Sequence, residues 1–122
     1  MLRVEPVTLR RNGVLLEPLS HRHAEGLIRC AEDGELWKLR ITSVPEPENV
    51  GAYIDKALSM PDRLPFAVID EASGRVLGTT SFHDIVPAID RLEIGWTWYA
   101  KSHQRTHVNK SCKLMLLTHA FD

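Results

Sequence analysis

The stretch that decides the fold is Arg91-Leu92-Glu93-Ile94-Gly95-Trp96-Thr97-Trp98-Tyr99, followed by a polar segment through Asn109 and an apolar-rich segment from Lys110 to Phe121. Alternating apolar and polar residues over 92–99 predict a strand, and the last segment predicts a helix. A strand that leads through a polar loop into a helix is a common anion site, because the helix's first backbone N–H groups have no internal partner. We therefore expect a ligand to bind near this stretch.

Alternation also assigns the residues of this strand to two faces, because successive side chains of a strand point to opposite sides. We expect the core face to carry Leu92, Ile94, Trp96 and Trp98. The opposite, more polar face would carry Glu93, Gly95, Thr97 and Tyr99. The glycine on that face would let another group approach the backbone closely.

Composition and net charge exclude several classes of function. The chain has 122 residues, 43% of them apolar and 25% charged, which predicts a single soluble domain over 1–122. A formal net charge of -1 gives no general attraction to nucleic acid or to an anionic membrane, and no run of 18 apolar residues predicts a membrane span. The charged N-terminus does not resemble a signal peptide, so we expect a cytoplasmic protein. The spacing of cysteines and histidines predicts neither a disulfide nor a metal site.

In the rest of the chain, period-two patterns predict strands and 3.6-residue periods predict helices. In chain order these are strands at 7–10 and 14–17 around an Asn12-Gly13 turn, helices at about 20–31 and 47–60, and strands at 66–70 and 75–83. Short connections join the last two strands to each other and to 92–99. Three consecutive strands connected in this way predict an antiparallel meander.

The last helix is expected to begin near Thr106 or Asn109, both of which can cap a helix. One side of it would carry Val108, Cys112, Met115, Leu116 and Ala120, and another side Leu114, Leu117 and Phe121. So wide an apolar surface predicts burial on more than one side.

Four segments resemble the GNAT N-acetyltransferase superfamily, and within it the ribosomal-protein N-terminal acetyltransferases. They are 8–24, 64–68, 74–80 and 92–99. The resemblance implies an α+β fold in which an antiparallel meander sheet has two helices before it and one long helix after it. Because the family continues into further strands, we expect this sequence to be a GNAT-like N-terminal portion that lacks the C-terminal strands.

The resemblance also implies acetyl-CoA as the acetyl donor and a primary amine, either a peptide N-terminus or a small amine, as the acceptor. The thioester would contact the backbone around Trp98 and Tyr99. The diphosphate would be held by a loop and helix start made of Gln104, Arg105, Thr106, His107, Val108 and Asn109. Arg105 suits that role because its guanidinium forms charge-assisted hydrogen bonds with phosphate oxygens.

Glu93 is the first candidate for the general base, because alternation directs its side chain away from the core. His83 and Asp84, near the end of the preceding strand, are further candidates for the same task. The alternative interpretation of Glu93 is a solvated or cross-strand carboxylate. The alternative function is a truncated, catalytically silent module that forms a homodimer through its exposed strand edge and last helix.

Overall fold

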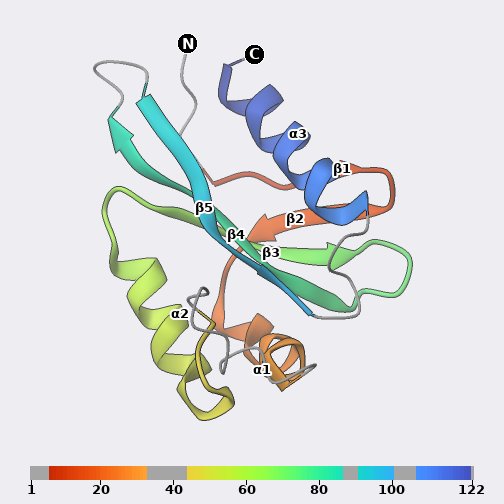
Figure 1. The fold of residues 1–122 in the computed structure, drawn as a ribbon, viewed down its shortest axis with the longest axis vertical. Coiled ribbons are helices and arrows are strands. Elements are labelled where there is room, and N and C mark those ends of the chain that lie inside the picture. The colour runs from red at the N-terminus through yellow and green to blue at the C-terminus, as the bar shows by residue number, and fades with distance from the viewer. Residues whose placement is uncertain (1–5, 33–43, 87–90, 101–106, 122) are drawn as a thin grey trace.

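The computed structural model describes residues 6–32, 44–86, 91–100 and 107–121 (Figure 1). Its elements, in chain order, are β1 (Leu9–Arg11), β2 (Val14–Pro18), η1 (His21–His23), α1 (Ala24–Glu32), η3 (Pro47–Asn49), α2 (Val50–Ser59), β3 (Leu64–Asp70), β4 (Val76–Val86), β5 (Arg91–Tyr99) and α3 (His107–Phe121). The predicted elements within these ranges are all present. The α+β fold class is confirmed.

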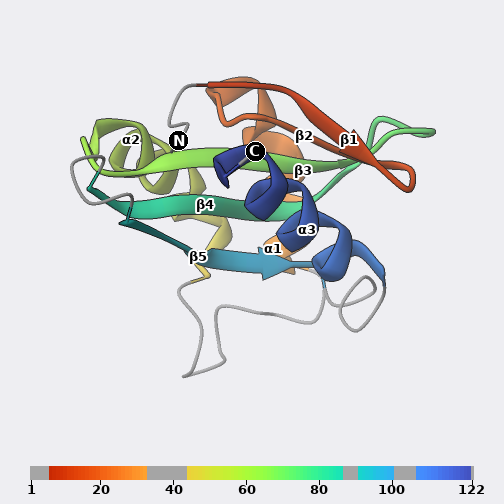
Figure 2. The same ribbon diagram turned by 90° about the horizontal axis from the view of Figure 1, so that it is seen from above.

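The five strands form one antiparallel sheet in which they follow the order of the chain, from β1 at one edge to β5 at the other (Figure 2). The predicted meander of β3, β4 and β5 is confirmed. So is the first hairpin, whose turn residues Asn12 and Gly13 have φ angles of 52° and 78°. Asparagine and glycine suit such a turn because they adopt positive φ at low cost.

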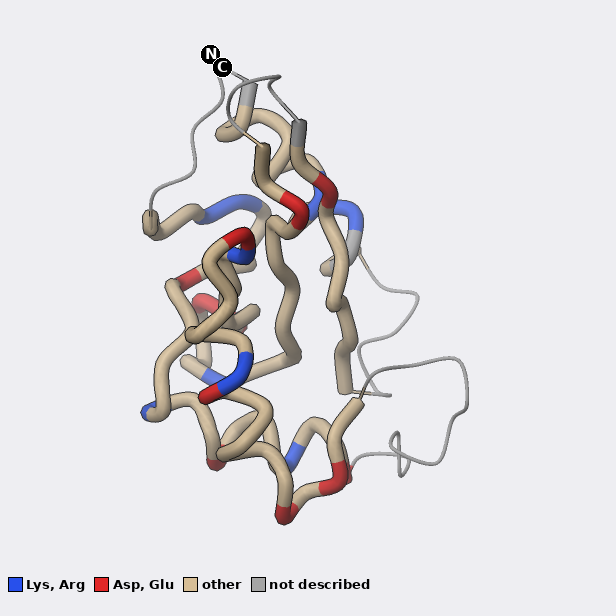
Figure 3. Tube along the Cα trace, turned by 90° about the vertical axis from the view of Figure 1, so that its left-hand side faces the viewer, with Lys and Arg blue, Asp and Glu red and all other residues tan. Residues whose placement is uncertain are grey.

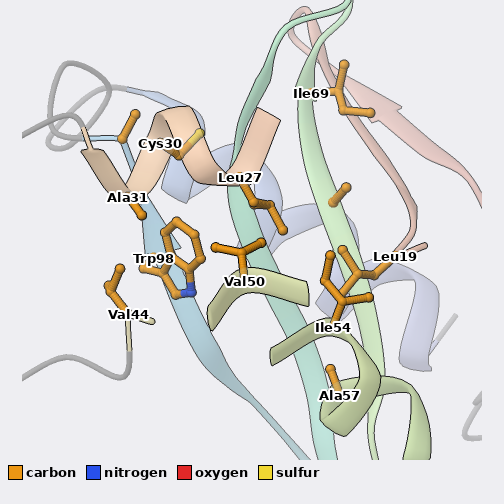
Figure 4. Packing of buried hydrophobic residues seen from close by; sticks show 12 residues of the cluster. Leu19, Leu27, Cys30, Ala31, Val44, Val50, Ile54, Ala57, Ile69 and Trp98 are labelled. Carbon is orange, nitrogen blue, oxygen red and sulfur yellow. The ribbon is translucent and has the colours of Figure 1, made fainter. Parts of the chain in front are cut away.

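Helices cover both faces of the sheet: α1 and α2 lie on one side and α3 lies on the other (Figure 1). The α1/α2 side encloses a core that includes Leu27, Val50, Ile54 and Trp98 (Figure 4). The α3 side encloses a second core that includes Phe66, Phe82 and Leu116. Both faces of the central strands are therefore buried, which explains the nearly continuous apolar run of Phe66 to Ile69.

A bulge in β5 overturns the predicted assignment of its faces. Thr79 pairs with Trp98 and Ser81 with Gly95, so two residues of β5 stand opposite Thr80. The extra residue reverses the alternation. Leu92 and Ile94 pack on the α3 side, but Trp98 packs on the α1/α2 side. Tyr99, predicted on the open face with Glu93, is instead buried on the α3 side.

The breadth of burial predicted for α3 is also wrong in the part of the helix whose side chains are described. Its predicted core side is buried, but Leu114 and Leu117 are 40% and 49% exposed. The reason is that α3 rests on the sheet with one side only. Within the described part of the chain, β5 pairs only with β4 and the side of α3 that carries Leu114 and Leu117 is exposed, and the homodimer stays a prediction.

Charged residues of both signs are interspersed along the described chain rather than segregated (Figure 3). This distribution agrees with a formal net charge of -1 and offers no extended basic surface. None of the helices in the described ranges combines the length and apolar character needed to cross a membrane.

The close approach of β4 to β5 leads to a stability prediction. A Cβ atom on Gly78 would lie 2.1 Å from the Trp98 carbonyl oxygen and 2.8 Å from the Tyr99 Cα, so backbone would have to move. We expect Gly78→Ala to lower the free energy of unfolding by roughly 1–3 kcal/mol in urea denaturation. Gly51→Ala is the control: it is exposed on α2 with nothing within 4 Å, and should raise that free energy by about 0.5–1 kcal/mol. Equal effects of the two substitutions would contradict this account.

Candidate active site

The candidate catalytic residues Glu93 and His83 lie beside each other on neighbouring strands. They are direct partners in the β4–β5 register, and the His83 Nδ1 atom is 3.8 Å from a Glu93 carboxylate oxygen. Asp84 approaches the same nitrogen at 3.3 Å. A hollow of about 370 Å³ opens here, lined by Met60, His83, Asp84 and Trp96. The structure thus brings the three predicted acid–base candidates together, and two of them, His83 and Asp84, line this hollow.

Gly95 determines where the His83 ring can lie. A Cβ atom on Gly95 would be 2.4 Å from His83 Nε2, so the imidazole occupies the space that a side chain would fill. The ring is largely buried, whereas the carboxylates of Asp84 and Glu93 are about half exposed. The predicted close approach at Gly95 is therefore made by a neighbouring side chain of the protein itself. The His83 imidazole is therefore fixed in position, with the partly exposed carboxylates of Asp84 and Glu93 next to its Nδ1 atom.

The same three side chains offer one nitrogen and two carboxylate oxygens, all within 4.8 Å of one another, which is a donor set that could hold a divalent cation. Sequence spacing predicted no metal site here, because Glu93 comes from a different strand than His83 and Asp84. The arrangement is equally suited to passing a proton between an amine and solvent, since carboxylates and imidazole are common general bases.

Behind the hollow lies a buried guanidinium that the sequence did not single out. Arg63 precedes β3 and donates from Nε to the Ser81 hydroxyl at 3.0 Å and from Nη2 to the Tyr53 hydroxyl at 3.2 Å. Its Cζ atom lies 4.7 Å from the centre of the Trp96 ring. In the sequence, Arg63 is visible only as a charged residue between the end of a helix and an apolar strand. Charged residues in such positions are usually solvated, so nothing marked this one as buried.

Trp98 and Tyr99, predicted to contact the thioester, keep their side chains inside the protein. The Trp98 indole N–H donates to the Tyr53 hydroxyl at 3.3 Å, and the two rings meet edge to face. Tyr99 forms a hydrogen bond with Cys112 of α3. These side chains are therefore occupied by contacts within the protein, and the contact of the backbone around them with a thioester stays a prediction.

The predicted diphosphate site falls partly outside the described residues. Gln104, Arg105 and Thr106 lie outside them, while His107, Val108 and Asn109 form the first turn of α3. The His107 Nε2 atom donates to the Asn12 carbonyl oxygen at 3.2 Å, and the Val108 side chain is buried. The backbone N–H groups at the start of α3 are the anion-binding feature that this turn supplies.

Comparison with known protein families connects this geometry to a known fold. The model of the acetyltransferase (GNAT) domain matches residues 14–122. The chain belongs to the GNAT acetyltransferase family. Acetyl transfer is the general activity of this family, and acetyl-CoA is its donor. The match covers both the hollow and the start of α3.

Solved structures give the same fold. A GCN5-related N-acetyltransferase from Brucella melitensis is 27% identical with a TM-score of 0.81, over 98% of this chain and 56% of that one. A protein from T. thermophilus described as an acetyltransferase is 30% identical with a TM-score of 0.80, over 98% and 63%. A ribosomal L7/L12 α-N-protein acetyltransferase in complex with coenzyme A is 16% identical with a TM-score of 0.75, over 93% and 67%.

These coverages mean that the chain spans less than two thirds of the length of the first two of these relatives. No curated protein matches the chain. The family match establishes the family, and the solved structures establish the fold.

The hydrogen bond between Tyr99 and Cys112 ties the end of β5 to α3. Burial raises the pKa of the Cys112 thiol from an ordinary value near 9 to about 11. Burial, followed by the influence of Cys112, raises the pKa of the Tyr99 hydroxyl well above its usual range. Both groups are therefore neutral at physiological pH, and Cys112 is a core residue and not a nucleophile.

This pair predicts how stability depends on pH. The folded state holds the Cys112 proton more tightly than the unfolded state does. The resulting contribution of the thiol to the free energy of unfolding is therefore complete below pH 9 and is lost as the pH rises to about 11. The thiol should contribute roughly 2–3 kcal/mol to the fall in unfolding free energy over that range. Urea denaturation at several pH values should show a shallower fall for Cys112→Ser, with Cys30→Ser as the comparison. Identical slopes for wild type and Cys112→Ser would contradict this assignment.

Proposed function

We propose that this GNAT chain is an acetyl-CoA-dependent N-acetyltransferase that acetylates a primary amine, either a peptide N-terminus or a small amine. The observation that carries the proposal is the Glu93–His83 pair, whose histidine lines the hollow together with Trp96 of the β5 bulge, in a chain of the GNAT family. A protonated amine needs a base before it can attack, and a carboxylate and an imidazole can both serve as that base. The coenzyme A complex of a relative supports the choice of donor.

Glu93 acts as the general base in this proposal. Its carboxylate is about half exposed, so an incoming ammonium can reach it directly or through a water molecule. His83 stands next to it and can accept or return a proton through Nδ1. The Asp84 carboxylate lies next to the same His83 Nδ1 atom. Its negative charge favours a cationic acceptor.

The reaction itself is a direct transfer. The free amine attacks the thioester carbonyl carbon, the C–N bond forms and the C–S bond breaks. Of the two protons that the ammonium loses, one goes to Glu93 and the other ends on the thiol of coenzyme A. Backbone N–H groups near Trp98 and Tyr99 would stabilise the oxyanion, because donors fixed at the site of developing charge need no reorganisation.

The start of α3 would hold the diphosphate. Unpaired N–H groups of its first turn and the helix dipole both favour a negative group there. Gln104, Arg105 and Thr106 precede that turn in the sequence and would add side-chain donors. In this proposal the donor would lie along β5 and the acceptor would enter the hollow.

The role of Glu93 is tested by Glu93→Gln, which preserves the side chain's shape and removes the base. We expect kcat to fall about 100-fold or more while the KM for acetyl-CoA is nearly unchanged. Thiol release from acetyl-CoA, measured with a panel of peptides and small amines, provides the rate. The control is Glu25→Gln, an exposed carboxylate on α1, which should retain the wild-type rate. Equal rates for the two variants would rule out Glu93 as the base.

The diphosphate site is tested by isothermal titration calorimetry with acetyl-CoA. Arg105→Ala should weaken binding about tenfold or more, since a charge-assisted hydrogen bond to phosphate is lost. Lys113→Ala, an exposed cation farther along α3, should bind as wild type does. Unchanged affinity in Arg105→Ala would place the diphosphate elsewhere, and no binding by the wild type up to millimolar acetyl-CoA would overturn the choice of donor.

A further inference from the structure

The bulge in β5 forces a large residue into an unfavourable backbone conformation. Trp96 has a φ of 51°, in the left-handed region that bulky residues avoid. Such a conformation persists only where surrounding contacts hold it. Together with Thr97, Trp96 stands opposite Thr80 alone, so the ladder cannot pair both of them with β4. The bulge therefore combines strain with two residues that have no register partner in β4.

Contacts hold this bulge from both faces of the sheet. On the α3 side the hydroxyls of Thr97 and Thr80 are 2.8 Å apart. On the α1/α2 side the Arg63 guanidinium lies against the Trp96 ring at 4.7 Å. Because Trp96 is the strained residue, Arg63 is the contact that acts directly on the strain.

Arg63 is itself anchored on two other elements, β4 and α2. It donates to Ser81 of β4 and to Tyr53 of α2, and its Cζ atom lies 5.5 Å from the centre of the Tyr53 ring. Tyr53 also accepts the Trp98 indole N–H, so the residue that follows the bulge is attached to the same group. A flat guanidinium with donors in a fixed fork suits this arrangement better than a flexible ammonium would.

The charge of Arg63 is the second unusual feature. The side chain is 7% exposed, yet among the described residues no carboxylate forms an ion pair with it. The faces of Tyr53 and Trp96 offset part of the cost of burying it, through their ring quadrupoles. A buried cation without a carboxylate partner produces a positive potential around it, and the bulge lies within that potential.

We propose that Arg63 is a positioning residue for acetyl transfer. It holds Trp96 in its left-handed conformation, so that backbone N–H groups of the bulge face the thioester carbonyl, and its charge favours the oxyanion that forms there. This inference rests on the proposed function. It assigns to a side chain outside the predicted site a role that is exerted through Trp96 and the backbone, not through contact with the substrate.

The test compares Arg63→Gln, which removes the charge and the fork, with Arg63→Lys, which keeps only the charge. The control is Arg10→Gln, an exposed arginine on the opposite edge strand. The first readout is the infrared carbonyl stretch of bound acetyl-CoA carrying ¹³C at the thioester carbonyl. Arg63→Gln should shift this band to higher frequency, Arg63→Lys by a smaller amount, and Arg10→Gln not at all.

The second readout is kinetic. Losing preorganised stabilisation of an oxyanion should lower kcat about 10- to 100-fold for Arg63→Gln, while the dissociation constant of acetyl-CoA changes little. Arg63→Lys should recover part of the rate. If Arg63→Gln does not fold, Tyr53→Phe removes one partner of the guanidinium and should produce a smaller shift of the band in the same direction.

The outcomes separate this inference from the proposed function. A variant that binds acetyl-CoA with an unshifted carbonyl band overturns the inference alone, even if its kcat and melting temperature fall, because it then has a purely structural role. A wild-type protein that does not bind acetyl-CoA overturns the proposed function and the inference together. A shifted band with a lowered kcat and retained acetyl-CoA affinity supports both.

Discussion

The bulge at Trp96 is the constraint on which the rest of this structure depends. One extra residue in β5 reverses the alternation of side chains, so the first half of the strand sends Leu92 and Ile94 toward α3 and the second half sends Trp98 toward α1 and α2. Without that reversal, Trp98 would face α3 and Tyr99 would face α1 and α2, so Tyr99 could not reach Cys112. The bulge therefore shapes the packing on both faces as well as the candidate site.

Two glycines make room around the bulge, for different reasons. Gly78 lets β4 approach the backbone of Trp98 and Tyr99, and Gly95 leaves space for the His83 ring. The first contact is between backbones and concerns stability, while the second sets the position of a candidate catalytic group. Between them, these positions keep β4 and β5 close on one side of the bulge and keep an imidazole beside Glu93 on the other.

Much of the fold could be predicted from the sequence because local patterns decide it. The Asn12-Gly13 turn, the 3.6-residue periods of α1 and α2, and the alternation in β3, β4 and β5 are signals that short segments carry by themselves. Glu93 and His83 could be selected as candidates because their residue types and strand positions are visible in the sequence. The faces of β5 could not be predicted, because no local signal marks a bulge at a tryptophan. Arg63 was missed for a related reason: its partners come from α2, β4 and β5, and nothing in its own segment distinguishes it from a solvated charge.

The sequence by itself determined the order of strands and helices, the family resemblance and the type of chemistry, since all three depend on residues that are near one another in the chain. Only the tertiary structure decided which residues of β5 face which core, which side of α3 stays uncovered, and which buried cation supports the strained tryptophan. These are consequences of pairing and packing between distant segments. A single extra residue in β5 decides the faces of that strand and the strain at Trp96, and its effect exists only once β4 is beside β5.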